Sequence, residues 1–133
     1  ELNPAPALRK DESGNVRTDA DLYMNGPAIF EFSMTRVPEL FATLFDEKFT
    51  LEDVDFFAFH QANKFMLDAL RRRLKLPQEK FIAEFEHCGN TVSSTIPIAL
   101  KECLSKGALA KGHTLAALGF GVGYSWAGCI IKW

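Results

Sequence analysis

The sequence has little of what marks several large classes of protein. Its apolar runs all fall short of the roughly 18 residues that can span a bilayer, and no secretory signal pattern is visible at its start. The formal net charge is only −2, so the overall balance does not favour nucleic acid. The cysteines, Cys88, Cys103 and Cys129, are odd in number and widely spaced, which argues against a disulfide framework. We therefore expect a cytoplasmic protein that binds neither membrane nor nucleic acid.

What is present is typical of a globular domain. The 133 residues are enough for one domain with a real core, and 47% of them are hydrophobic. Residues 1–20 are rich in proline, charge and small polar side chains, and we expect a loop or hairpin that turns at 13–15. Residues 21–133 are expected to form the folded domain. Because the chain opens at Glu1 and not at Met, we expect it to be cut from a longer protein.

Strand and helix patterns alternate along most of the chain. A short apolar stretch at 22–24 precedes a helical pattern at 27–45, in which Pro38 is expected to kink or divide the helix. Helices are also predicted at 61–76 and 93–105, and buried strands at 55–59, 81–85 and 114–118. A glycine-rich bend at 119–123 makes the last strand, 124–133, antiparallel to its neighbour. This order predicts an α/β layer with a mixed, mostly parallel sheet.

His60 is the first residue to suspect of chemistry. It follows an apolar run with three phenylalanines and precedes a helical pattern, which places it at the carboxyl edge of the predicted sheet. Open α/β sheets bind their ligands at that edge. A lone histidine is weak evidence, however, and one that only caps a strand or hydrogen-bonds a turn would give the same pattern.

Two further strand ends are expected beside His60. One carries the Gly89-Asn90 corner and the other the bend at 119–123. Histidine and asparagine at this edge can donate two hydrogen bonds to one oxygen, and a glycine bend adds backbone N–H groups. Such donors stabilise an enolate or oxyanion, and the loss of one can cost about 10²–10³ in rate.

Three motifs at these strand ends carry a family resemblance. They are His-Gln-Ala-Asn at 60–63, Gly-Asn-Thr-Val-Ser-Ser-Thr-Ile-Pro at 89–97 and Gly-Phe-Gly-Val-Gly-Tyr-Ser-Trp at 119–126. From about Asp19 to Trp133 the chain resembles the C-terminal half of a β-ketoacyl-acyl carrier protein synthase III. The resemblance implies a thiolase-like half: a five-stranded, mostly parallel mixed sheet with helices on both faces. It implies no cofactor and no metal.

The resemblance also implies a Cys–His–Asn triad and a two-stage reaction. An acyl group passes from coenzyme A to the cysteine, and His60 and Asn90 then hold the thioester carbonyl of malonyl-acyl carrier protein during decarboxylation. His60 would act as a neutral N–H donor. The family's cysteine lies in the N-terminal half, so this chain alone is expected to be inactive. Its partners would be that half, the two thioester substrates and a second copy in a homodimer.

Weaker implications concern the rest of the site. Asn63 resembles a residue that meets the pantetheine arm, although a contact within the first helical turn would explain it equally. The N–H near Val122 resembles an oxyanion-hole donor, and Phe120 would line the pocket.

Carrier-protein docking is expected to differ from the common family pattern. Many family members carry an arginine where Phe65 stands here. Lys64, Arg71 and Arg72 are candidates to replace it, against a merely solvated basic face.

Several alternatives stay open at this stage. Cys88 is interpreted as a spectator, and Cys103 and Cys129 as core residues. A zinc site from His60, His87 and Cys88 lacks paired-ligand spacing. Other functions consistent with the fold are a non-catalytic partner subunit, and an acyltransferase or thioester hydrolase.

Overall fold

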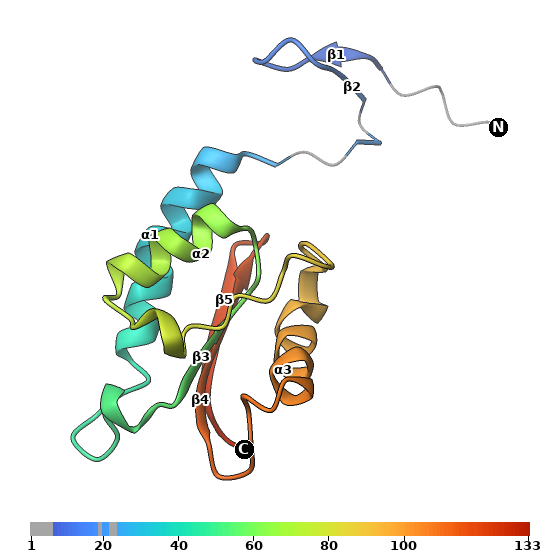
Figure 1. Ribbon diagram of the computed structural model, residues 1–133. Helices are drawn as coiled ribbons and strands as arrows, with labels where there is room; N and C mark the ends of the chain where they lie inside the picture. The colour runs from blue at the N-terminus through green and yellow to red at the C-terminus, as the bar shows by residue number, and fades with distance from the viewer. Residues whose placement is uncertain (1–6, 19, 22–23) are drawn as a thin grey trace, which may run out of the picture.

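The computed structural model describes residues 7–18, 20–21 and 24–133, so most of the apolar stretch expected at 22–24 lies outside the described residues. A small antiparallel hairpin, β1 (Arg9–Lys10) and β2 (Val16–Arg17), precedes the α/β part of the chain (Figure 1). The division of the chain at residue 20 stays a prediction. The α-helices and strands that follow, in order, are α1 (Gly26–Ala42), β3 (Phe56–Phe59), α2 (Lys64–Arg73), α3 (Thr95–Ser105), β4 (Thr114–Gly121) and β5 (Ser125–Lys132). Three short 3₁₀ helices lie between them: η1 (Leu51–Asp53), η2 (Gln78–Lys80) and η3 (Val92–Ser94).

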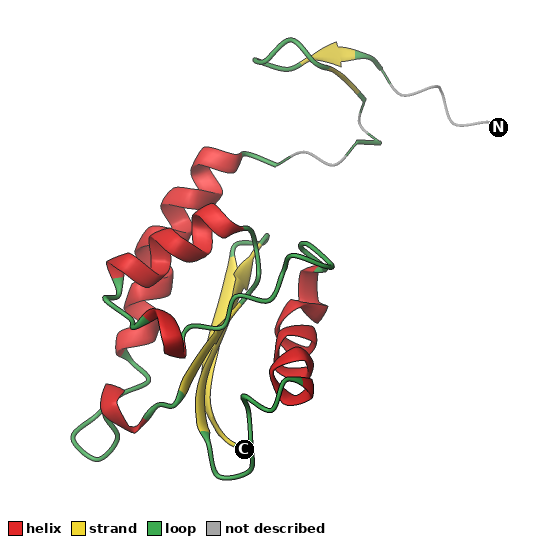
Figure 2. Cartoon of the chain, in the orientation of Figure 1, coloured by secondary structure: helices red, strands yellow, loops and turns green. Residues whose placement is uncertain are grey.

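The main sheet is mixed, as the sequence predicts. Its order is β3-β4-β5, with β3 parallel to β4 and β4 antiparallel to β5. Helices α1 and α2 cover one face of the sheet and α3 covers the other (Figure 2). The α/β fold with helices on both faces is confirmed, but the sheet has three strands within the described residues, where five were expected.

Strand β3 is buried on both faces. Phe57 and Phe59 pack into the cluster beneath α1 and α2, while Ala58 packs into the cluster beneath α3. Each of these three side chains is at most 1% exposed. An unbroken apolar run is what such a central strand requires, because successive side chains point to opposite faces.

Helix α1 begins at a cap provided by Asn25, whose side chain accepts a hydrogen bond from the N–H of Ala28. Pro38 was expected to kink or divide the helix; the division is wrong, since α1 continues through Pro38 to Ala42, and the kink stays a prediction. The phenylalanine-rich stripe is core, as expected: Phe41 packs on the rings of Phe57 and Phe59.

The predicted strand at 81–85 is wrong beyond its first residue. Phe81 forms a single parallel bridge with Phe57, and the N–H of Ile82 donates to the carbonyl of Phe57. Past that point the buried side chain of Gln61 takes the place of a strand ladder. Its Nε2 contacts the carbonyl oxygens of Phe59 and Ile82 at 2.6 and 3.3 Å, and its Oε1 accepts from the N–H of Glu84. A side-chain amide thus satisfies backbone groups that would otherwise pair directly.

Cys129 is also misplaced by the sequence reasoning. It was expected in the core but is exposed on β5, whereas Cys103 is buried on α3 as expected. Along β5, Ile130 packs into the cluster beneath α1 and α2, so its neighbour Cys129 faces the other side of the sheet. Helix α3 contacts β3 and leaves that side of the edge strand uncovered at Cys129.

Candidate active site at the carboxyl edge of the sheet

His60 lies directly after β3, at the carboxyl edge where the sequence places it. Its backbone N–H continues the parallel ladder by donating to the carbonyl of Leu118 at 2.8 Å. The imidazole is half-buried, and this burial lowers the pKa of His60 below its ordinary value, which favours the neutral ring. The rings of His60 and Phe120 meet edge to face with their centroids 5.5 Å apart.

Hydrogen bonds link the Asn90 corner to His60. The Oδ1 of Asn90 accepts from the N–H of Val92 at 2.9 Å, which leaves its NH₂ group free to donate. The Oγ1 of Thr95 lies 3.1 Å from the carbonyl oxygen of Val92 and 2.7 Å from Nδ1 of His60. The two residues that the sequence singles out are thus connected indirectly, through the backbone of Val92 and the hydroxyl of Thr95.

The corner itself has an unusual backbone. Gly89 has φ +64°, which glycine adopts readily, but Val92 has φ +56°, which is rare for a β-branched residue. Strained backbone of this kind gathers at functional sites. The hydrogen bond from the N–H of Val92 to Asn90 helps to hold it.

The glycine-rich segment contributes a strand end and a turn. Residues 119–121, expected in the bend, belong to β4, so Phe120 is a buried strand residue that faces His60. The reversal occupies residues 122–124, between Gly121 and its pairing partner Ser125. Val122 is exposed in this turn, and its carbonyl accepts from the hydroxyl of Ser125 at 3.3 Å.

The residues expected to bind pantetheine and carrier protein lie on α2. Asn63 caps this helix, since its Oδ1 accepts from the N–H of Met66 at 2.9 Å, and its side chain is exposed. Lys64 and Arg71 line a groove of about 220 Å³ between α2 and residues 78–86. Arg71 also donates to the carbonyl of Leu76 at 3.2 Å, whereas Arg72 is exposed and does not line this groove.

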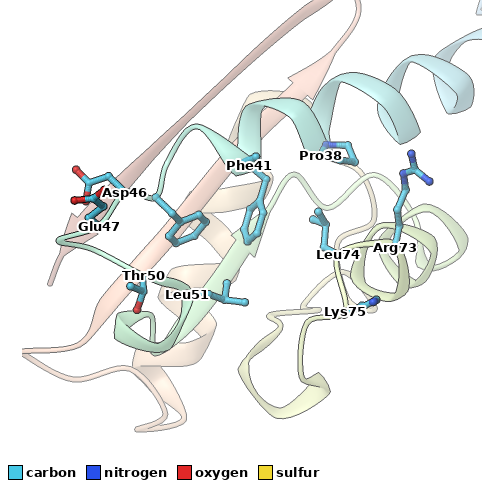
Figure 3. Close-up of a pocket in the computed structure, with 11 residues that line it drawn as sticks. Pro38, Phe41, Asp46, Glu47, Thr50, Leu51, Arg73, Leu74 and Lys75 are labelled. Carbon is cyan, nitrogen blue, oxygen red and sulfur yellow. The ribbon is translucent and has the colours of Figure 1, made fainter.

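A larger cavity, about 730 Å³, lies away from His60 (Figure 3). It is formed by the C-terminal ends of α1 and α2 and the loop after α1, with Phe41, Leu51 and Leu74 among its lining residues. Because His60 precedes the N-terminus of α2, this cavity belongs to the opposite end of that helix and has no part in the site.

Sequence reasoning missed two side chains that build the site. Gln61 and Thr95 were each seen only as members of a motif, at 60–63 and 89–97. Both are polar and almost completely buried, at 1% and 2% exposure. Their positions beside apolar helix starts were the available signal, since a buried polar side chain has to find a hydrogen-bond partner.

Two kinds of feature are absent from the part of the chain that the structure describes. No group of three His, Cys, Asp or Glu side chains there is placed to hold a metal ion. None of its helices combines the length and apolar character needed to cross a membrane.

The sheet, the helices on both of its faces and the histidine–asparagine edge together define a thiolase-like half. Residues 44–133 match the family model described as 3-oxoacyl-[acyl-carrier-protein (ACP)] synthase III C terminal. The chain belongs to this family and corresponds to the C-terminal part of such synthases.

Related proteins and solved structures support the same family assignment. A β-ketoacyl-[acyl-carrier-protein] synthase III of Acaryochloris marina is 43% identical over 111 residues, and one of Synechocystis is 35% identical over 134. A crystal structure of a 3-oxoacyl-(acyl-carrier-protein) synthase III superposes with a TM-score of 0.94 at 49% identity. The corresponding Thermus thermophilus structure gives 0.81 at 33% identity.

The matches cover most or all of this chain but only part of each relative. The Acaryochloris marina protein matches 83% of this chain and the Synechocystis protein 100%, yet the chain spans only 33% and 40% of their lengths. The two structures cover 100% and 97% of the chain, which spans 40% and 39% of theirs. The chain thus spans about two fifths or less of the length of these relatives.

Proposed function

We propose that this chain is part of a condensing enzyme that joins an acyl group from acyl-coenzyme A to malonyl-acyl carrier protein, with loss of carbon dioxide. The observation that carries the proposal is the hydrogen-bonded connection from Asn90 through Val92 and Thr95 to His60 at the carboxyl edge. The names of the relatives support it, because each is a β-ketoacyl-acyl carrier protein synthase III.

His60 and Asn90 would stabilise the charge that decarboxylation creates. As the bond to the carboxylate breaks, its electron pair moves toward the thioester carbonyl and gives an enolate. Nε2 of His60, when it carries a proton, and Nδ2 of Asn90 are the donors aimed at that oxygen. The resulting carbanion attacks the acyl thioester on the cysteine, and the cysteine sulfur leaves with its electron pair. Asn90 suits this role, because its Oδ1 is already held by the N–H of Val92.

None of the three cysteines of this chain is a candidate nucleophile. Burial raises the pKa of the Cys103 thiol, which disfavours the reactive thiolate. Cys129 lies on an edge strand, and Cys88 contacts the carbonyl oxygen of Gly89 in the corner. We therefore assign the nucleophile to a cysteine of the N-terminal half, which makes the 133-residue chain inactive by itself. The three free cysteines favour a reducing cytoplasm as its location.

The N-terminal half and a second copy in a homodimer are the proposed protein partners. Large apolar side chains are exposed at the carboxyl edge, among them Val92 at 74% and Val122 at 76%. In addition, the hydroxyl oxygen of Thr91 is buried without a hydrogen-bond partner among the described residues. Exposed apolar side chains and an unpaired polar atom are typical of a surface that another chain segment covers.

The remaining roles are assigned by position. Phe120 lines the pocket beside His60, and the N–H of Val122 donates a hydrogen bond to the oxyanion. Asn63 meets the pantetheine arm with its free amide N–H groups. Lys64, Arg71 and Arg72 attract the acidic carrier protein.

The test uses the complete synthase and separates its two half-reactions. Asn90→Ala removes one donor to the enolate, so carbon dioxide release from malonyl-acyl carrier protein should fall about 10²-fold or more. Formation of radiolabelled acyl-enzyme should be nearly unchanged, because asparagine does not titrate and need not touch the first acyl group. Asn15→Ala, in the β1–β2 turn, is the matched control and should alter neither rate. Decarboxylation at the parental rate in Asn90→Ala would show that Asn90 is only a corner residue.

A further inference from the structure

Among the described residues, Thr95 is the one side chain that contacts both a ring nitrogen of His60 and the Asn90 corner. Its hydroxyl oxygen lies 2.7 Å from Nδ1 of His60 and 3.1 Å from the carbonyl oxygen of Val92. The residue is 2% exposed, so its hydroxyl has little access to bulk water. Neither the family motifs nor the proposed reaction gives Thr95 a role.

The hydroxyl has one proton for two neighbours, and this decides the tautomer of His60. If Nδ1 carries the ring proton, it donates to Oγ1, and the hydroxyl donates to Val92, so that both contacts are hydrogen bonds. If Nε2 carries the proton, the hydroxyl must donate to Nδ1. The 3.1 Å contact with Val92 then joins two acceptors in a buried place. The first arrangement has one hydrogen bond more and is therefore favoured.

The carbonyl of Val92 is held where this arrangement needs it. It already accepts the backbone N–H of Thr95, which closes the short η3 turn (Val92–Ser94). Val92 keeps its positive φ with its own N–H bound to Asn90. The acceptor of the Thr95 hydroxyl is therefore fixed by the backbone and by the proposed catalytic asparagine.

We propose that Thr95 is a positioning residue that holds neutral His60 as the Nδ1–H tautomer, leaving Nε2 unprotonated at the open edge of the sheet. Within the described residues Nε2 has no hydrogen-bond partner, so it is free to accept a proton from outside this chain.

The functional meaning of this tautomer rests on the proposed function. There, Nε2 takes the proton of the nucleophilic thiol: the S–H bond breaks, the N–H bond forms, and the electron pair stays on sulfur. The coenzyme A thiolate that leaves takes its proton from water. His60 is then an imidazolium, with Nδ1–H on Thr95 and Nε2–H as the donor for decarboxylation, in place of the neutral donor that the family resemblance implies.

The tautomer is measured from the ¹⁵N NMR signals of the two ring nitrogens, in protein with ¹⁵N-labelled histidine above pH 7, where His60 is neutral. We expect Nδ1 of His60 to be the protonated nitrogen. His113 is the internal control, since its Nδ1 accepts the N–H of Ala110 at 3.1 Å and must show the opposite tautomer. Thr95→Val, which lacks the hydroxyl, should move His60 toward the Nε2–H form, and Thr95→Ser should preserve Nδ1–H.

Two results would overturn the inference: Nε2–H as the main form in the parent protein, or Nδ1–H retained in Thr95→Val. Unchanged His113 signals show that a variant is folded, and Thr95→Ala replaces Thr95→Val if those signals move.

A kinetic experiment on the complete synthase separates this inference from the proposed function. Acyl-enzyme formation should slow roughly ten-fold in Thr95→Val and recover in Thr95→Ser. If the synthase forms no acyl-enzyme while the NMR result holds, the proposed function fails and the role of Thr95 in fixing the tautomer stands. Equal rates in parent and Thr95→Val would show that the tautomer does not matter for loading.

Discussion

The ring of Phe120 stands at 86° to the ring of His60, with the two centroids 5.5 Å apart. Phe120 comes from β4 and His60 from the end of β3, and these strands are parallel neighbours. The phenyl ring therefore removes water from one side of the imidazole, and burial is the cause of the lowered pKa of His60.

Removing the Phe120 ring should bring the pKa of His60 back toward its ordinary value of 6.5. We expect this rise in Phe120→Ala because the charged imidazolium would regain hydration. The measurement is an NMR titration of His60. Phe45→Ala, which deletes an equal ring at the lining of the larger cavity, should leave the titration unmoved. If the pKa of His60 is unchanged in Phe120→Ala, residues other than Phe120 are responsible for its burial.

The lowered pKa also predicts how stability depends on pH. The unfolded chain, in which His60 titrates near 6.5, binds the proton more readily than the folded chain. The contribution of neutral His60 to the free energy of unfolding is therefore complete above pH 6.5, and it is lost as the pH falls through the pKa of the folded protein. Urea unfolding should show a larger loss of stability between pH 7.5 and 5.5 for the parent than for His60→Gln. Parallel curves would contradict the shift.

Gln61→Leu should destabilise the fold by about 3 kcal/mol. The substitution keeps an apolar body but leaves the carbonyls of Phe59 and Ile82 and the N–H of Glu84 without their partner. Urea denaturation measures the effect. Gln78→Leu is the matched control, because Gln78 is exposed, and its effect should stay within about 0.5 kcal/mol. A loss below 1 kcal/mol for Gln61→Leu would mean that water replaces the amide.

Lys75→Gly should stabilise the protein by about 0.5–1 kcal/mol. Helix α2 ends in a Schellman motif, with the N–H of Leu76 bound to Arg71 and that of Lys75 bound to Arg72. Lys75 occupies the position that favours glycine, with φ +55°. Thermal unfolding measures the gain, and Lys75→Ala, which removes the charge but keeps the strain, should not show it.

Helix α3 supplies the reverse experiment. It ends in the same motif, but with Gly107 at the equivalent position, φ +71°. Gly107→Ala should therefore destabilise by about 1 kcal/mol. Effects of the same sign at the two positions would refute this explanation.

Charge reversal on α2, at Lys64 in its first turn or at Arg72 in its last, should weaken the use of carrier protein by the complete synthase. Lys64→Glu and Arg72→Glu should raise the KM for malonyl-acyl carrier protein several-fold and scarcely alter that for acyl-coenzyme A, because the effect is attraction of an acidic protein. Arg71 is unsuited to this test, since it also bonds the carbonyl of Leu76. Lys48→Glu, an equal change in an exposed loop, is the control. Equal effects on both substrates would indicate damage to a shared channel.

The sequence by itself determined the layout of the fold and the place of the site. The apolar run before His60, the helical spacing after it and the glycine-rich segment near the C-terminus are local patterns. They depend on hydrophobic periodicity and turn chemistry, which act within a few residues. They were sufficient to place His60 at the carboxyl edge and to make β5 antiparallel to β4.

Only the tertiary structure decided which polar groups satisfy one another across the chain. Gln61 contacts residues 82 and 84, and Thr95 contacts His60 across 35 positions. No local pattern encodes such partners. For this reason residues 82–85 looked like a strand, although an amide side chain does the pairing there. The exposure of Cys129 has the same origin, since a strand's composition does not say whether a helix covers it. The burial of Thr95 against His60, and with it the tautomer of the imidazole, exists only once α3 has packed against β3.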